Sequence, residues 1–146
     1  MAKHKIVLNE KHINVLQLAL ESYMRLGIGQ LENVLGDLKF HHYETFKDKA
    51  HVFQDPDFIQ AVSTIKSMLF DARLGGSKGI THPNVDNDFK ISYEMYQKLR
   101  QFMALQREPK GGWSKDHDSP LPLSGEELIE IIKEIDDEIK TSTSNE

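Results

Sequence analysis

The sequence predicts an all-α fold, a compact bundle of about four helices with a short N-terminal extended segment and two loops of functional length. Apolar residues recur at intervals of three and four over several long stretches, which is the period of an amphipathic helix. Residues that cap helices stand directly before these stretches. Only residues 5–8 have the β-branched character of a strand, so no sheet is expected.

The first helix is expected to begin after Asn9, whose side chain can cap it. Gly27 and Gly29 interrupt its pattern, and each costs about 1 kcal/mol relative to alanine inside a helix. Because the apolar positions stay in phase across both glycines, we expect one kinked helix rather than a break. Residues 39–54 then form a short helical turn and a loop. The apolar positions of the first helix are Ile13, Leu16, Leu20, Tyr23, Met24, Leu31, Val34, Leu35 and Leu38.

The second helix has a clear start, because Asp55 can cap it and Pro56 suits its first position, where the missing N–H does no harm. Gly75 and Gly76 are expected to end it. Its apolar stripe is predicted to be buried. The stripe consists of Phe58, Ile59, Val62, Ile65, Met68 and Leu69.

The third helix is expected to begin near Asn84 or Asp86 and to end before Pro109. It carries apolar residues on two faces, which indicates a central helix with neighbours on both sides. A last helix is predicted from Ser124, which forms a capping-box pattern with Glu127. The isoleucine-rich stripe of this last helix is Leu128, Ile131, Ile132, Ile135 and Ile139.

Composition narrows the class of protein. The 146 residues suit one domain, which we place at residues 1–140, followed by a disordered tail at 141–146. The absence of cysteine excludes disulfide scaffolds and cysteine nucleophiles. No apolar run approaches the roughly 20 residues of a membrane span, so we expect a cytoplasmic protein with no membrane partner. The net charge of −5 argues against nucleic acid as a partner. No cofactor and no metal site are expected.

The segment from Arg73 to Asn84 has the strongest functional pattern in the chain. Its glycines let backbone N–H groups turn toward a ligand, basic side chains add positive charge, and a helix N-terminus follows. It is not a Walker A loop, because its order is Gly-Gly-Ser-Lys-Gly. The segment predicts an anion site, and the alternative is a helix end followed by a plain surface loop. The candidate residues are Arg73, Gly76, Ser77, Lys78, Gly79, Thr81, His82 and Asn84.

Tyr93, Tyr96 and Arg100 follow at helical spacing and extend this candidate site. A tyrosine ring can stack on a base, and an arginine can bind a phosphate through two hydrogen bonds. A nucleotide-like ligand would then place its phosphates in the loop and its base against the tyrosines. The alternative is that this aromatic stripe belongs to the core or to a dimer contact.

The predicted last helix carries a row of acidic residues in an ExxE and ExxD order: Glu127, Glu130, Glu134 and Asp137. This order resembles the all-α nucleotide pyrophosphatases of the MazG type, which hold Mg²⁺ with such pairs. In that family the pairs come from different helices, whereas one helix here would spread them over about 15 Å. The row therefore also fits a solvated helix face, or a surface that docks on a basic host protein.

Four segments together resemble small accessory proteins encoded by bacteriophages and prophages. They are residues 20–32 (LESYMRLGIGQLE), 78–80 (KGI), 92–100 (SYEMYQKLR) and 120–123 (PLPL). The resemblance implies an antagonist of host defence that acts in the host cytoplasm, including sponges that sequester cyclic nucleotide signals. It favours a non-enzymatic binder over an enzyme. We expect a homodimer or higher oligomer, formed through close helix approach at Gly27 and Gly29 or through the last helix.

Overall fold

The computed structural model describes residues 3–133 and confirms the all-α class. Within that range no strand is present, and residues 3–9, which include the expected extended segment, have no regular secondary structure. Short 3₁₀ turns lie at Lys47–Lys49, Val52–Gln54 and Lys115–His117. None of the helices in residues 3–133 is long and apolar enough to cross a lipid bilayer. The α-helices are α1 (Glu10–Gly27), α2 (Leu31–His41), α3 (Tyr43–Phe46), α4 (Pro56–Phe70) and α5 (Asn87–Arg107).

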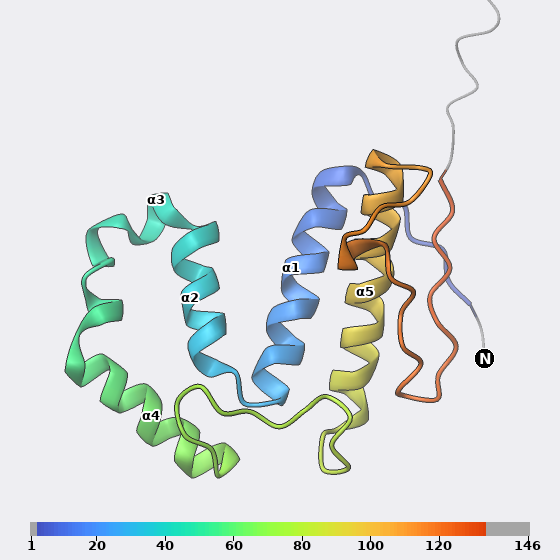
Figure 1. Ribbon diagram of the computed structural model, residues 1–146. Coiled ribbons are helices and arrows are strands. Elements are labelled where there is room, and N and C mark those ends of the chain that lie inside the picture. The colour runs from blue at the N-terminus through green and yellow to red at the C-terminus, as the bar shows by residue number, and fades with distance from the viewer. Residues whose placement is uncertain (1–2, 134–146) are drawn as a thin grey trace, which may run out of the picture.

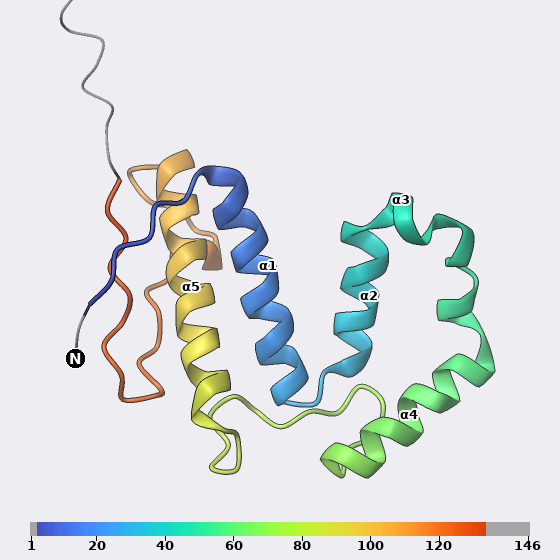
Figure 2. The same cartoon turned by 180° about the vertical axis from the view of Figure 1, so that it is seen from behind.

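The helices form two parts that lie side by side (Figure 1). In the body, α1 and α5 pack against each other along most of their length, and residues 118–133 cover the other side of α5. The arm consists of residues 31–70, in which α2 leads through the short α3 to α4. Residues 71–86 return from the end of α4 to the start of α5, and Figure 2 shows this crossing from behind. The arm contacts the body mainly where α1 meets α2 and along this returning loop.

The expected continuous first helix is wrong, because the chain breaks between α1 and α2. Gly29 has φ +82°, a left-handed conformation that favours glycine. The N–H of Ile28 still bonds to the carbonyl of Met24, and the N–H of Gln30 bonds to that of Arg25 at 2.8 Å. These bonds close the end of α1 before α2 starts at Leu31. Although the apolar positions stay in phase along the sequence, the two helices have different neighbours: α1 packs mainly on α5, and α2 contacts α1, α3 and α4.

Two apolar clusters hold the body together. One joins Ile13 of α1 to Leu99 and Met103 of α5, with Ile129 and Ile131 packed against it. The second gathers at the other end of the pair, around buried Met24, Ile28 and Val85. Since α5 contributes to both clusters and has α1 on one side and residues 118–133 on the other, the prediction of a central third helix is confirmed.

The predicted start of α4 is confirmed, and its predicted end is wrong. The carboxylate of Asp55 accepts a hydrogen bond from the N–H of Asp57 at 2.8 Å, with Pro56 at the first position. The helix ends at Phe70, because Asp71 adopts a left-handed conformation with φ 51° well before the glycines at 75 and 76. Of its predicted apolar stripe, only Val62 is buried.

The last helix predicted from Ser124 is also wrong within the described residues, and its remainder from Glu134 onward lies outside them. Buried Glu94 of α5 accepts hydrogen bonds from the N–H groups of Leu123 and Ser124 and from the Ser124 hydroxyl. Buried Gln97 accepts another from the N–H of Leu121 at 3.1 Å. Because α5 satisfies these N–H groups, the segment runs as extended chain along α5 instead of forming the capping box.

We expect Glu94→Gln to loosen this C-terminal segment. An amide keeps one acceptor oxygen but turns an NH₂ group toward N–H donors, so the cost should be about 1–2 kcal/mol. Amide hydrogen exchange at Leu123 and Ser124 should then quicken at least tenfold, while the α1–α5 pair keeps its protection. Glu126→Gln, which changes an exposed carboxylate on the same segment, is the control. Unchanged exchange in Glu94→Gln would show that Glu94 does not hold the segment.

Candidate anion-binding cavity

A cavity of about 390 Å³ lies between α1, the loop that follows α4, and α5. This volume is in the range of small-molecule sites in proteins. Three separate stretches of chain supply its walls. The lining residues are Glu21, Met24, Arg25, Ile28, Gln30, Ser77, Lys78, Gly79, Ile80, Tyr93, Tyr96 and Arg100.

Backbone contacts carry the loop across the end of α1. The N–H of Lys78 donates to the carbonyl of Ile28 at 2.9 Å, and the side chain of Gln30 donates to the Ser77 hydroxyl at 3.4 Å. Ile80 packs beside Met24 and Ile28 in the second apolar cluster. The loop is therefore anchored to α1, and Ser77 and Lys78 come to lie opposite the tyrosines of α5.

Arg25 brings a positive charge to the α1 wall. Its guanidinium bonds to the Glu21 carboxylate at 2.7 and 3.1 Å and lies 3.9 Å from Asp37. Burial alone would lower the pKa of Arg25, but the hydrogen bond and charge of Glu21 outweigh it and raise that pKa. Arg25 therefore stays charged and is held in place by Glu21, one turn earlier on the same helix.

Lys78 is the cation of the cavity with the fewest protein contacts. Its ammonium group has no ion-pair or hydrogen-bond partner within residues 3–133, while its backbone is fixed by Ile28. The side chain is only partly exposed. An ammonium group on an anchored backbone and without its own acceptor is suited to an incoming anion.

Arg100 lines the α5 wall together with Tyr96. Its guanidinium lies over the Tyr96 ring at 5.4 Å from the ring centre, in the arrangement of a cation–π pair. It also donates to the carbonyl of Lys115 at 3.1 Å and lies 3.6 Å from Asp116. Its Nε is buried and has no hydrogen-bond acceptor among the described residues. This Nε is the guanidinium atom that lies 3.6 Å from Oδ1 of Asp116, so Asp116 pairs with Arg100 by charge beyond hydrogen-bond distance.

Tyr93 and Tyr96 both line the cavity. Tyr93 accepts a hydrogen bond from Gln97 at 2.8 Å, which leaves its own O–H free to donate. Burial, followed by the charge of Glu21, raises the pKa of Tyr96. The Tyr96 hydroxyl therefore remains protonated at neutral pH. Both phenols can donate to an acceptor in the cavity, and their rings offer flat apolar surface.

The cavity unites only part of the predicted site. The residues that line it are Ser77, Lys78, Gly79, Tyr93, Tyr96 and Arg100. The residues that do not are Arg73, Gly76, Thr81, His82 and Asn84. His82 instead accepts a hydrogen bond from the N–H of Asn84 at 3.1 Å and shapes the turn before α5.

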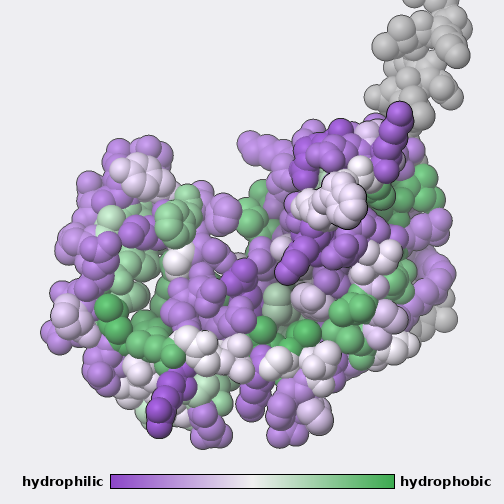
Figure 3. Space-filling model, viewed as in Figure 1, coloured by the Kyte–Doolittle hydropathy of each residue, from purple (hydrophilic) through white to green (hydrophobic). Residues whose placement is uncertain are grey.

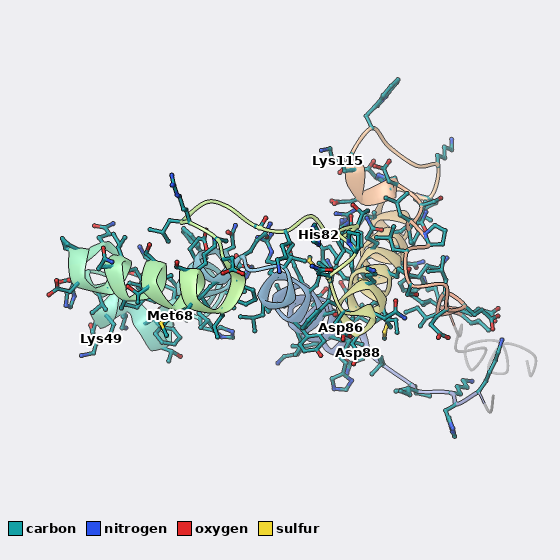
Figure 4. All side chains as sticks on the ribbon, turned by 90° about the horizontal axis from the view of Figure 1, so that it is seen from below. Lys49, Met68, His82, Asp86, Asp88 and Lys115 are labelled. Atoms are coloured by element: carbon teal, nitrogen blue, oxygen red, sulfur yellow. The ribbon has the colours of Figure 1, made fainter. Side chains whose placement is uncertain are left out.

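The start of α5 does not contribute its N–H groups to the cavity. Asp86 caps the helix by accepting from the N–H of Asp88 at 2.9 Å, so two carboxylates occupy its first turn. Figure 4 shows His82, Asp86 and Asp88 gathered at this end of α5. The helix N-terminus is satisfied by its own cap, and the cavity begins about two turns later, at Tyr93.

The sequence does not single out the cavity wall formed by α1 and the residues just after it. This wall consists of Glu21, Met24, Arg25, Ile28 and Gln30. The spacing of Glu21 and Arg25 is an i,i+4 ion-pair signal, but on sequence alone such a pair fits any exposed helix face. Glu21 and Arg25 line the cavity only because α1 packs antiparallel on α5. The sequence pattern of neither helix predicts this packing.

The acidic row does not form the expected helical face within the described residues. Glu127 and Glu130 lie on extended chain, and Glu127 pairs with Lys3 at 2.8 Å on the surface. Glu134 and Asp137 lie outside the described residues. Within residues 3–133 no three His, Asp or Glu side chains are grouped to hold a metal ion. The ExxE resemblance and the acidic docking helix therefore gain no structural support.

The cavity thus lies between an anchored loop, whose Lys78 has no ion-pair partner in the described part of the chain, and a wall with two arginines and two tyrosines. Such a set can bind an anion next to a flat ring. No family model, curated protein or solved structure matches this chain, so the argument for function rests on the sequence and on this geometry.

Proposed function

We propose that this protein binds a nucleotide-like anion in the cavity between α1 and α5 and holds it without chemical change. As a phage-type accessory protein it would lower the free concentration of a signal used by bacterial host defence. The observation that carries the proposal is the convergence of Lys78 with Arg25, Arg100 and the two tyrosines on one cavity of about 390 Å³.

The charges of the lining favour an anion. Three cationic side chains and one carboxylate face the cavity, although the whole chain has a net charge of −5. The carboxylate, Glu21, is already bonded to Arg25. Local charge decides the affinity of a small pocket for an ion, so the acidic character of the chain does not oppose binding.

The resemblance to phage accessory proteins and the cavity involve the same residues. Residues 20–32, 78–80 and 92–100 carry most of that resemblance. They also supply every lining residue except Ser77. These segments lie far apart in the chain and meet only at the cavity. That the resembling segments meet at the cavity supports a ligand site formed by all three. It also supports sequestration of a signal as the biological role of this site.

The ligand can be sought by native mass spectrometry of the purified protein after incubation with a nucleotide panel. The panel should include cyclic mononucleotides, cyclic dinucleotides, cyclic ADP-ribose, ATP and inorganic phosphate. Binding should add one discrete mass and raise the melting temperature in proportion to RT ln(1 + [L]/Kd). Recovery of the ligand unchanged would support sequestration, whereas release of a cleaved product would refute it. No adduct from the panel or from a cell nucleotide extract would refute binding itself.

Two substitutions on the same loop separate the cavity from general surface charge. We expect Lys78→Gln to weaken binding at least tenfold, because it removes the one cation of the cavity that has no side-chain partner among residues 3–133. Arg73→Gln removes the same charge from an exposed residue outside the lining and should change affinity less than twofold. Titration calorimetry of both variants gives the comparison. Equal losses in both would mean that long-range charge, and not the cavity, attracts the anion.

A further inference from the structure

The outer face of α4 is exposed, although the sequence pattern predicts that its apolar stripe is buried. Three residues of its apolar stripe stand open to solvent: Ile65 is 46% exposed, Met68 78% and Leu69 68%. Met68 and Leu69 follow Ile65 by three and four residues, and exposed Ala61 lies one turn before Ile65 on the same side of the helix. The inner side packs on α2 and buries Val62 and Lys66. The stripe is therefore wider than the surface that α2 covers.

The place of α4 in the molecule leaves this face accessible. Figure 4 labels Met68 on α4, in the part of the molecule far from α5. The face of the arm seen in Figure 3 mixes hydrophobic and hydrophilic surface. The arm meets the rest of the chain through α2 and the returning loop. No described element packs on the side formed by Ile65, Met68 and Leu69.

This face also has no exposed charge. Between Asp57 and Asp71 the only charged residue is Lys66, which is fully buried against Glu32. The other exposed side chains over these turns are small or uncharged, such as Gln60 and Thr64. In a chain that is 28% charged, thirteen successive positions without an exposed charge are unusual for a surface helix in water.

We propose that this face of α4 is the contact surface between two copies of this chain. Two molecules with net charge −5 repel each other, and an uncharged face lets identical surfaces meet without a like-charge contact. An apolar helix face is also self-complementary under a two-fold axis, because α4 of one copy can lie against α4 of the other.

The size of the patch fits a dimer of modest stability. Its three exposed apolar residues alone form a patch smaller than the roughly 800 Å² that each partner buries in a standard interface, so we expect a weak dimer. Thr64, which lies one turn before Met68, would supply part of the polar rim that such interfaces have. Of the dimer sites expected from the sequence, Gly27 packs on Phe89 within the chain and residues 124–133 form no helix, while the rest of the expected last helix lies outside the described residues.

Sedimentation velocity of the full chain from about 1 to 300 µM tests the proposal, with dissociation expected on the order of 10 µM. Met68→Glu would bury a carboxylate in the contact and should weaken association at least tenfold. Ser67→Glu adds the same charge at the residue just before Met68. Because Ser67 points to the other side of α4, this change should alter association less than threefold. Circular dichroism and the melting temperature of the dilute monomer should be alike in both variants.

A dimer that Met68→Glu dissociates and Ser67→Glu leaves intact supports the proposal. A chain that stays monomeric at 300 µM overturns it, as does a dimer that both variants preserve or both dissociate. Ligand binding gives an independent readout, because no residue of α4 lines the cavity. Met68→Glu should keep the affinity of the wild type for any ligand of that cavity, so failure of the dimer and failure of the binding proposal are distinguishable.

Discussion

Gly27→Ala should destabilise the protein by about 3 kcal/mol, the upper end of the cost of overpacking a core. A Cβ atom at this last residue of α1 would lie 2.1 Å from Cγ of Phe89 and 2.3 Å from both Cδ atoms. These atoms lie at the end of the Phe89 ring that is attached to the backbone of α5, so they cannot move far without moving the helix. The ring also contacts Tyr23, with ring centres 4.9 Å apart, so it has little freedom to withdraw. The melting temperature should fall on the order of 10 °C.

Gly36→Ala provides the matched control with the opposite sign. Gly36 lies inside α2, and no heavy atom would be within 4 Å of its added Cβ. The same chemical change should therefore stabilise the protein by about 0.5–1 kcal/mol, the ordinary helix preference of alanine over glycine. If Gly27→Ala proved neutral or stabilising as well, α1 and α5 would not cross as closely as the structure shows.

A substitution of Phe89 tests whether its ring causes the loss of stability in Gly27→Ala. In the wild type, Phe89→Ala should cost about 3 kcal/mol for the lost aromatic contacts. In the Gly27→Ala background the same change should cost far less, because it relieves the overlap. Chemical denaturation of the four proteins gives this coupling, which should exceed 1 kcal/mol. Additive effects would show that Gly27 matters for a reason unrelated to Phe89.

The parts of the fold that the sequence predicts well are those that a few neighbouring residues decide. Asp55 and Asp86 cap α4 and α5 as their positions indicate, and each needs only an N–H two residues away. The left-handed end of α4 at Asp71 is less visible, since an aspartate adopts this conformation at some cost whereas the glycines that follow adopt it freely.

The parts that the sequence predicts poorly depend on partners far along the chain. Residues 124–133 have a sound helical pattern, but Glu94, thirty residues before Ser124, binds their backbone in an extended form. Similarly, Lys78 and Tyr96 could be proposed as one site from their spacing, whereas Arg25 enters only through the packing of α1 on α5. The spacing of apolar residues along the chain cannot predict the contact of Glu94 with residues 123–124 or the approach of Arg25 to α5, because both depend on tertiary structure.

Glu32→Gln should be the most damaging single change in the arm. The ammonium of Lys66 is fully buried and lies 2.5 Å from Oε1 of Glu32. The same oxygen accepts the N–H of Gly75 at 2.7 Å, so Glu32 connects α2 to α4 and to the returning loop. Removing its charge leaves a buried ammonium without a counter-ion, at a cost of about 3 kcal/mol. Lys66→Met should cost less, about 1–2 kcal/mol, because the Glu32 side chain is 28% exposed and keeps its bond from Gly75, although its Oε2 is buried without a hydrogen-bond partner among the described residues.

The same pair makes the stability of the arm depend on pH. Burial alone would raise the pKa of Glu32, but hydrogen bonds from Lys66 and from the backbone N–H of Gly75, together with the charge of Lys66, lower it. A carboxyl whose pKa is lower in the folded than in the unfolded protein stabilises the fold above its unfolded pKa of about 4.3. That stabilisation is lost as the pH falls from there through the folded pKa.

Urea denaturation between pH 7 and pH 3 measures this contribution directly. The stability difference between wild type and Glu32→Gln should be constant from pH 7 to about 5 and should shrink below about pH 4.3. Lys66→Met removes the charge that lowers the pKa of Glu32, so its own stability should fall less steeply in acid than that of the wild type. A wild-type curve parallel to that of Glu32→Gln across the whole range would mean that Glu32 titrates alike in both states. The arm would then be held by the apolar contacts of α2 and α4 alone, and the buried ammonium would have to be stabilised by other means.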